Sequence, residues 1–166
     1  GISKLWRLIS DFGSYKAANL SGTRLEKAKF FNCNLRAAAL AGASLQGAYF
    51  YGCNFTKANF SGADLRHAQF VNCLFHGADL RDVRVSHKTR FDSCRYDDQA
   101  RFGFDGFDSS YGGLNSEEHK ALLEARGLRR EDQAKLDQRK EQEEREAIVS
   151  AVIEARFREM RLNDSD

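Results

Sequence analysis

The stretch A-N-L-S-G-T-R-L-E-K-A-K-F-F-N-C-N-L-R-A, residues 18–37, places a large apolar residue third in each successive group of five. Leu20, Leu25, Phe30 and Leu35 are those residues, and the same spacing continues on both sides of the stretch. A small residue, nearly always Ala or Cys, stands two positions before each of them. Regular self-similarity over this length indicates a repeat architecture. The full apolar series is Tyr15, Leu20, Leu25, Phe30, Leu35, Leu40, Leu45, Phe50, Phe55, Phe60, Leu65, Phe70, Phe75, Leu80 and Val85.

A period of five matches neither an α-helix, which repeats every 3.6 residues, nor a flat strand, which repeats every two. It matches a coil that turns a corner every five residues. In such a coil the large and the small residue of each unit point inward, and the other three face solvent or form the corner. The sequence therefore predicts a solenoid rather than a bundle or a sandwich.

The units A-N-L-S-G (residues 18–22), A-D-L-R-H (63–67) and A-D-L-R-D (78–82) resemble the pentapeptide-repeat family. The resemblance covers roughly half of the chain. It implies a right-handed, four-sided β-helix with twenty residues in each coil. The predicted fold class is thus a mainly β solenoid of about four coils, with an N-terminal capping helix and a C-terminal α-helical tail.

A twenty-residue coil can be checked within the sequence. Cys33, Cys53 and Cys73 lie twenty residues apart in the small inward position. One residue is inserted near 86–88, after which Phe91 and Cys94 resume their columns. Stacked coils pair their backbones with the coils above and below. The expected columns are Phe30, Phe50, Phe70, Phe91; Leu35, Phe55, Phe75, Tyr96; Leu25, Leu45, Leu65, Val85; and Leu20, Leu40, Phe60, Leu80.

Asn or Asp often stands directly before the large apolar residue, as at Asn19, Asn34, Asn54, Asn59, Asp64 and Asp79. Short polar side chains of this kind bond to backbone groups two residues further on. We expect them to hold the corners of the coil.

Both ends of a solenoid need covering. Residues 1–14 are expected to form an N-terminal cap, and residues 15–96 the β-helix. Residues 97–114 are rich in aromatic residues and Gly, and they predict a lid or connector that contains Phe102, Phe104, Phe107 and Tyr111. The cap is expected to be a short amphipathic helix formed by Ile2, Leu5, Trp6, Ile9 and Phe12.

Residues 115–166 predict a helical tail. Asn115 can cap a first helix over 116–126, with Glu118 at its third position and Gly127 after its end. A second helix is expected over about 129–162, and its first half is almost wholly polar. An apolar stripe begins after residue 147 and must be buried against the solenoid, a second copy or another protein. The stripe consists of Ile148, Val149, Val152, Ile153, Phe157 and Met160.

The chain lacks the sequence patterns of catalytic and metal sites. The four Cys have no C-x-x-C spacing, so we interpret them as small buried residues in the reduced state, which suits a cytoplasmic protein. The histidines have no catalytic or metal-ligand spacing, and surface positions are expected for them. No nucleotide-binding loop, nucleophile elbow or zinc-protease motif is present. We therefore predict no enzyme activity, no cofactor and no metal, and no apolar run is long enough for a membrane span.

Two surface features remain as candidates for function. Residues 18–96 carry 11 Lys and Arg against 5 Asp and Glu, whereas residues 114–166 carry 11 against 14. The second feature is an outward-facing apolar surface made of Phe31, Tyr49, Tyr51, Val71 and Leu74. Exposed apolar columns on a rigid support often mark interaction surfaces.

The predicted function is a non-catalytic protein–protein interaction or scaffold module, in which a rigid β-helix surface is combined with a helical tail for oligomerisation or docking. An unidentified protein partner and self-association through the tail are both expected. One alternative is a topoisomerase-binding protein, because some pentapeptide-repeat proteins protect DNA gyrase by resembling duplex DNA. That resemblance requires an acidic rod, and this solenoid is basic. The other alternative is a basic binder of nucleic acid or an anionic surface.

Overall fold

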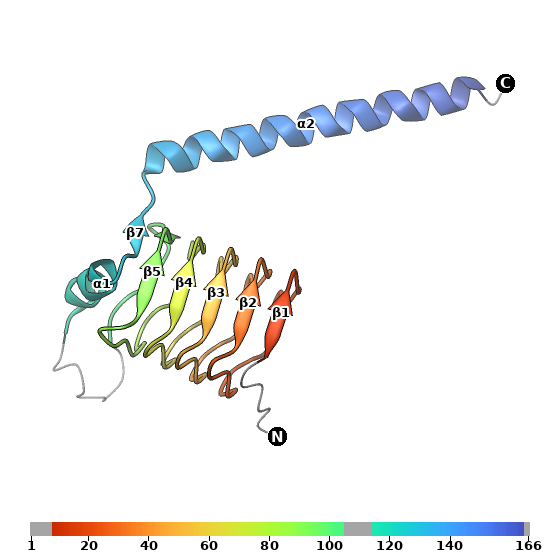
Figure 1. The fold of residues 1–166 in the computed structure, drawn as a ribbon. Coiled ribbons are helices and arrows are strands. Elements are labelled where there is room, and N and C mark those ends of the chain that lie inside the picture. Colours follow the sequence, from red (N-terminus) through yellow and green to blue (C-terminus); the bar gives the residue numbers. More distant parts are fainter. Residues whose placement is uncertain (1–7, 105–113, 165–166) are drawn as a thin grey trace. The chain divides into compact units, whose positions relative to one another are not determined.

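The computed structural model describes residues 8–104 and 114–164, and its first part is a β-solenoid. Five short strands form a parallel sheet on one side of it, in chain order: β1 (Ile9–Asp11), β2 (Lys29–Phe31), β3 (Tyr49–Tyr51), β4 (Gln69–Val71) and β5 (Arg90–Asp92). Figure 1 shows them side by side, one from each coil. The chain divides into two compact units, 1–130 and 131–166, which are described separately.

The pairing register confirms the twenty-residue coil. Phe30 lies opposite Phe50, and Phe50 opposite Phe70. Phe70 lies opposite Phe91, one residue later than the period requires, which confirms the insertion. Isolated parallel bridges, for example Asn34 to Asn54 and Asn59 to Asp79, join the coils on the other sides. The result is a four-sided solenoid of about four coils.

The four predicted columns form the core. From Leu25 to Phe91 every large member is at most 7% exposed, and most are fully buried. The rings of Phe30, Phe50, Phe70 and Phe91 are stacked, with centroid separations of 5.0, 4.9 and 5.1 Å and interplanar angles of 9° or less. The Ala and Cys column is buried beside them and leaves room for the large rings. Close packing of this kind is what makes a core sensitive to the loss of a side chain.

The corners are held as the sequence predicts. Asn34 Oδ1 accepts a hydrogen bond from the Arg36 backbone N–H at 3.1 Å, and Asn59 Oδ1 accepts one from the Ser61 N–H at 2.9 Å. The same bond recurs at the other predicted positions, Asn19, Asn54, Asp64 and Asp79. From Tyr15 to Leu80, the residue two positions after each large apolar residue has a positive φ, as at Gly42 (65°) and Gly62 (71°). Proline cannot adopt that conformation, and the chain has none.

The N-terminal capping helix is not present in the described residues. Ile9 lies in strand β1, and Phe12 is at a corner with a φ of 55°. The Lys29 N–H donates to the Leu8 carbonyl and the Phe12 N–H donates to the Phe31 carbonyl, so this segment joins the ladder as a further partial coil. The prediction of a helix was wrong for Ile9 and Phe12. Backbone hydrogen bonds to the next coil, at residues 29–31, outweighed the weak helical spacing of the apolar residues. Ile2, Leu5 and Trp6 lie outside the described residues.

The other end of the solenoid is covered by helix α1 (Ser116–Ala125) and the segment after it. The Asn115 side chain accepts a hydrogen bond from the Glu118 N–H, which is the predicted N-cap. After Gly127, strand β7 (Arg129–Arg130) pairs with β6 (Arg95–Tyr96). Leu123 and Leu128 are fully buried and close the core.

Gly127 allows this closure, because its φ is 109° and an added Cβ would lie 2.9 Å from the Phe91 carbonyl oxygen. Two aromatic residues of the predicted lid lie in the described residues, and both pack at this end. Phe102 packs edge-on against Tyr96 at 5.1 Å and the Phe104 ring lies 4.4 Å from that of His119, whereas Phe107 and Tyr111 lie outside the described residues.

The second unit is dominated by helix α2 (Gln133–Asp164), 32 residues long. Its side chains from residue 137 to residue 164 are exposed except that of Arg139, which is half-buried. A helix this polar gains little from packing within its own unit.

His119 is the one charged or titratable residue of α1 that is fully buried in the described chain. Its Nδ1 accepts a hydrogen bond from the Gly103 N–H at 2.8 Å, and the Phe104 ring lies 4.4 Å away. Burial lowers the pKa of this imidazole, although the Val83 carbonyl and the Asp82 carboxylate act in the opposite direction. The sequence prediction of a surface histidine was wrong at this position.

Removing one ring from the middle of the Phe column should be costly. We expect Phe50→Ala to lower the free energy of unfolding by about 3–5 kcal/mol, because the neighbouring coils cannot collapse into the space. Urea denaturation followed by circular dichroism would measure it, with the exposed Gln69→Ala on the next strand as control. A loss below about 1 kcal/mol for Phe50→Ala would contradict the stacked column.

The solenoid should lose stability on mild acidification because of His119. Its folded pKa is lowered, so the unfolded chain takes up the proton first as the pH falls below about 6.5. Stability is therefore fully present above that pH and declines below it. We expect His119→Asn, which keeps an acceptor for the Gly103 N–H, to remove this decline between about pH 7 and 5.5. Equal declines in the two proteins, measured by urea denaturation, would refute the assignment.

Candidate interaction surfaces

The first candidate is the outward side of the β1–β5 sheet, which we call the wall and define by Phe31, Tyr49, Tyr51 and Val71. Phe31 lies opposite Tyr51, and Tyr51 opposite Val71, so these three form one column across three coils. The Phe31 and Tyr49 rings are in contact, with centroids 5.8 Å apart. Tyr51 is 39% exposed and the other three are half-buried. The wall is therefore a small apolar surface on a rigid sheet.

The structure separates Leu74 from this wall. Leu74 bridges to Asn54 and Arg95, beyond the corner at Asn72, and so belongs to the next side of the solenoid. Ile9, which is 69% exposed, lies on β1 of the same sheet, in the row of Tyr49 and separated from it by Lys29. Sequence reasoning did not find Ile9, because it assigned that residue to a helix; the twenty-residue interval to Lys29 was the signal that placed it in the sheet.

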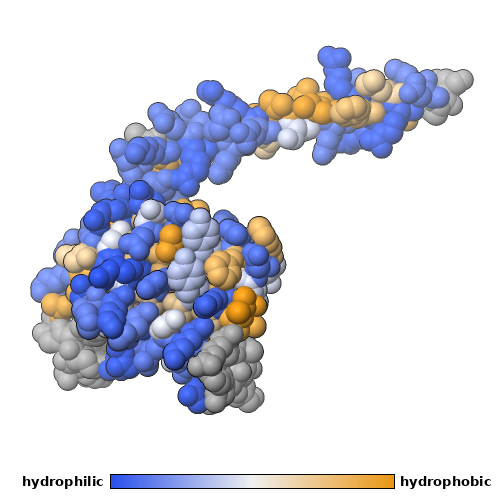
Figure 2. All heavy atoms as spheres, viewed as in Figure 1, coloured by the Kyte–Doolittle hydropathy of each residue, from blue (hydrophilic) through white to orange (hydrophobic). Residues whose placement is uncertain are grey.

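The second candidate is the apolar stripe on α2, defined by Ile148, Val149, Val152, Ile153, Phe157 and Met160. Each of these side chains is between 49% and 64% exposed. Figure 2 shows hydrophobic residues gathered on the C-terminal half of the helix, after a polar N-terminal half. Within its own unit nothing covers this stripe, and removing apolar surface from water is favourable.

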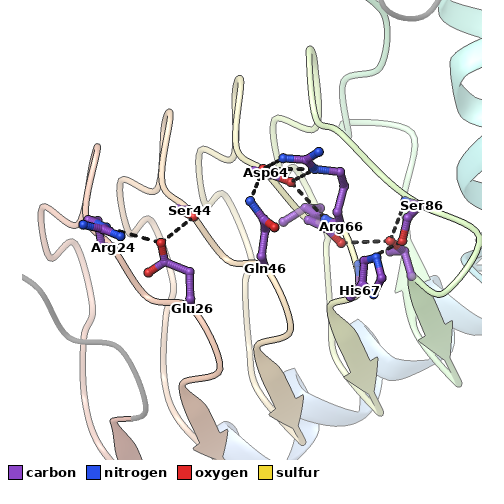
Figure 3. A network of polar contacts seen from close by, with 10 residues as sticks. Arg24, Glu26, Ser44, Gln46, Asp64, Arg66, His67 and Ser86 are labelled. Atoms are coloured by element: carbon purple, nitrogen blue, oxygen red, sulfur yellow. Dashed lines mark hydrogen bonds and ion pairs between the residues drawn. The ribbon is translucent and has the colours of Figure 1, made fainter.

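A third side of the solenoid is polar, and its groups are engaged with one another (Figure 3). Glu26 Oε1 accepts hydrogen bonds from Arg24 at 3.3 Å and from Ser44 at 3.1 Å. In the next coils, the Asp64 carboxylate accepts bonds from Gln46 at 2.8 Å and from Arg66 at 2.7 Å.

Partial burial works against the ionisation of Asp64, but the hydrogen bonds from Arg66 outweigh it and keep the pKa of the carboxyl below its usual range. These side chains are largely engaged with one another, although Glu26 Oε2 has no hydrogen-bond partner among the described residues.

A cavity of about 500 Å³ lies between α1 and the last coil. Its walls include four cations, Arg81, Arg101, Arg130 and Lys120, and within the described residues all of them except Arg101 are in ion pairs. Arg130 is 2.5 Å from the Asp98 carboxylate, and Lys120 is 2.9 Å from that of Glu117. Arg81 is 2.6 Å from the carboxylate of Asp79. Cations engaged in this way do not define a ligand site.

The cysteine column is structural. Cys33, Cys53, Cys73 and Cys94 are free thiols and all are buried, as the sequence predicts. Each thiol lies near a main-chain carbonyl, as between Cys73 and Phe50 at 3.6 Å and between Cys94 and Phe70 at 3.3 Å. Burial raises the pKa of the Cys73 thiol well above its ordinary value. A thiol held protonated in this way is a poor nucleophile and a poor metal ligand.

Among the residues that the structure describes, no group of three or more His, Cys, Asp and Glu could hold a metal ion. His67 and His87 lie near each other on adjacent coils, with ring centroids 6.3 Å apart. In the same residues no helix combines the length and the apolar character that crossing a membrane requires.

These columns and ladders define the chain as a parallel β-solenoid repeat protein. Residues 23–100 match the family described as the pentapeptide repeat region. This part of the chain is therefore a pentapeptide repeat region. No curated protein matches the sequence closely enough to be reported as a relative.

Several solved structures are similar. A pentapeptide repeat protein from the thylakoid lumen of Arabidopsis thaliana is 24% identical, covering 68% of this chain and 88% of that one, with a TM-score of 0.41. Rfr23, from the cyanobacterium Cyanothece 51142, is 18% identical over 59% and 86% of the two chains, with a TM-score of 0.34. QnrB1, a plasmid-mediated fluoroquinolone resistance protein, is 20% identical over 63% and 60%, with a TM-score of 0.36. At these values the similarities carry no argument about a partner or an activity.

The buried column predicts four unreactive thiols. Because Cys53, Cys73 and Cys94 are at most 1% exposed, we expect a thiol-specific reagent such as dithionitrobenzoate to modify none of them rapidly in the folded protein. All four should react at once in denaturant. Rapid modification of Cys73 under native conditions, with circular dichroism unchanged, would show that the column is open.

Proposed function

We propose that this chain is a non-catalytic interaction module, in which the β-solenoid supplies a rigid surface and α2 supplies the principal docking element. The observation that supports the proposal is the apolar stripe. Six large apolar side chains on one helix are each about half exposed or more. A free helix of this composition gains little stability from its own unit, so a partner that covers the stripe would stabilise it.

The wall is the second docking surface of the proposal. Its column of Phe31, Tyr51 and Val71 lies on paired strands, so its shape does not have to form on binding. A preformed surface loses little conformational entropy when a partner binds. Aromatic side chains such as Tyr51 are also the types most often found at the centre of protein interfaces. The wall is small, however, and we give α2 the larger share of the binding.

Several observations are compatible with the same proposal. The four thiols are buried and free of disulfides in the described residues. Reduced thiols suit a cytoplasmic protein. The topoisomerase and nucleic-acid alternatives stay predictions, and the basic charge of residues 18–96 disfavours mimicry of DNA.

Removing the stripe should abolish association. We expect the full chain to have a solution mass above that of a monomer, or to retain a protein partner, and a chain that ends at residue 146 to do neither. The measurement is light scattering after size exclusion, with circular dichroism and thermal unfolding to check that the solenoid is intact in both. If both forms are monomeric and neither retains a partner, the role of the tail fails.

A wall variant serves as the comparison. The change Tyr51→Ser leaves the stripe unaltered, and since Tyr51 points outward it should leave the solenoid folded. Retained association in this variant, together with its loss in the truncated chain, would assign the main contact to α2.

A further inference from the structure

We propose that the occupant of the α2 stripe is α2 of a second copy of this chain, packed antiparallel and centred on Ala151. The inference rests on the proposed function and names the partner for its principal docking element. Its basis is the pattern of residues along one line of the helix, together with two charged residues on that line that have no ion-pair partner in the described residues.

The line is a seam of six residues that recur at alternating intervals of four and three. Such spacing keeps side chains on the face where two helices meet. The seam consists of Gln142, Glu146, Val149, Ile153, Arg156 and Met160. Val152 and Phe157 flank it on either side, and both are more than half exposed.

The two charged residues of the seam stand at equal distances from Ala151, with Glu146 five residues before it and Arg156 five residues after it. The apolar residues Val149 and Ile153 lie two residues on either side of the same centre. In an antiparallel pair about Ala151, Glu146 of each copy therefore lies opposite Arg156 of the other, and Val149 lies opposite Ile153. The two charge pairs bracket a central apolar contact.

Glu146 and Arg156 have no ion-pair partner of their own in the described residues. Glu146 accepts only a hydrogen bond from the Gln142 amide, at 2.9 Å. Two other pairs of charges on the helix lie within reach of each other, Arg145 and Glu141 at 3.9 Å and Arg158 and Glu154 at 4.0 Å. The seam itself holds one unpaired charge of each sign, at positions that an antiparallel second helix would bring together.

A parallel pair in register would not satisfy these charges. It would bring Arg156 against Arg156 and Glu146 against Glu146, and like charges held close together at an interface oppose association.

The interface is short. At a rise of about 1.5 Å per residue, the stripe from Ile148 to Met160 is about 18 Å long. An apolar contact of that length is below the size of an obligate interface. The dimer should therefore be reversible and depend on protein concentration, which makes its dissociation constant measurable.

Charge reversal in the full chain tests the register. Glu146→Arg and Arg156→Glu should each place like charges opposite one another and weaken dimerisation by about tenfold or more. The double variant Glu146→Arg/Arg156→Glu exchanges the two signs and should recover the wild-type dissociation constant. An equimolar mixture of the two single variants should likewise form a heterodimer. Sedimentation equilibrium measures all of these constants.

Arg158→Glu is the matched control. It makes the same change in charge, but Arg158 lies on the opposite side of the helix from the seam, so dimerisation should stay near the wild-type value. Circular dichroism of every variant verifies that α2 remains helical, since its exposed seam positions are not needed for folding.

Three results would overturn the inference. They are a wild-type chain that is monomeric at all concentrations up to about 0.5 mM, a dimer that neither single reversal weakens, and a double variant that does not recover. The first of these, with a different protein retained through the tail, would leave the proposed function standing. Monomers that retain no partner would remove both.

Discussion

The whole structure depends on the backbone ladder that joins each residue to the one a coil later. Phe30, Phe50 and Phe70 can stack at about 5 Å only because their main chains pair at that interval. The same ladder fixes every other column, since a slip of one residue would turn each inward side chain toward solvent. The insertion before Phe91 is tolerated because it falls at a corner. There Thr89 takes the small inward position and its hydroxyl donates to the Leu65 carbonyl at 2.8 Å.

Most of this ladder could be predicted from the sequence, because each coil repeats the same inward pattern. The columns, the coil length, the insertion and the corner bonds of Asn34 and Asn59 all follow from intervals that can be counted. The N-terminal segment was different. Ile9 and Phe12 fit a weak helical spacing as well as the repeat, and the choice between them depended on hydrogen bonds to the next coil. Local patterns do not reveal such bonds when only one or two units are present.

The end of the solenoid that α1 covers, and the wall, show the same limit of prediction from sequence. His119 is buried by contact with Gly103 and Phe104, which lie outside the repeat. The spacing of residues in the sequence therefore gave no indication that His119 is buried. Leu74 has the twenty-residue spacing of an outward column, but the corner at Asn72 places it on another side from Val71. The five-residue period determines which column a side chain belongs to. The side that the column faces depends on where the positive-φ corners fall.

The polar side of the solenoid and helix α2 differ in how their charged side chains are paired, and this difference is why the docking function is proposed for the stripe. On the solenoid, opposite charges meet within a coil or between neighbouring coils, as at Asp64 and Arg66. The repeat that builds the core also brings these groups together, so the fold itself satisfies them. An isolated helix has no neighbouring coil, and residues ten apart on it cannot reach one another. We propose that Glu146, Arg156 and the apolar residues between them contact a second surface, and a copy of the same helix in the opposite direction would provide both the charges and the apolar contact.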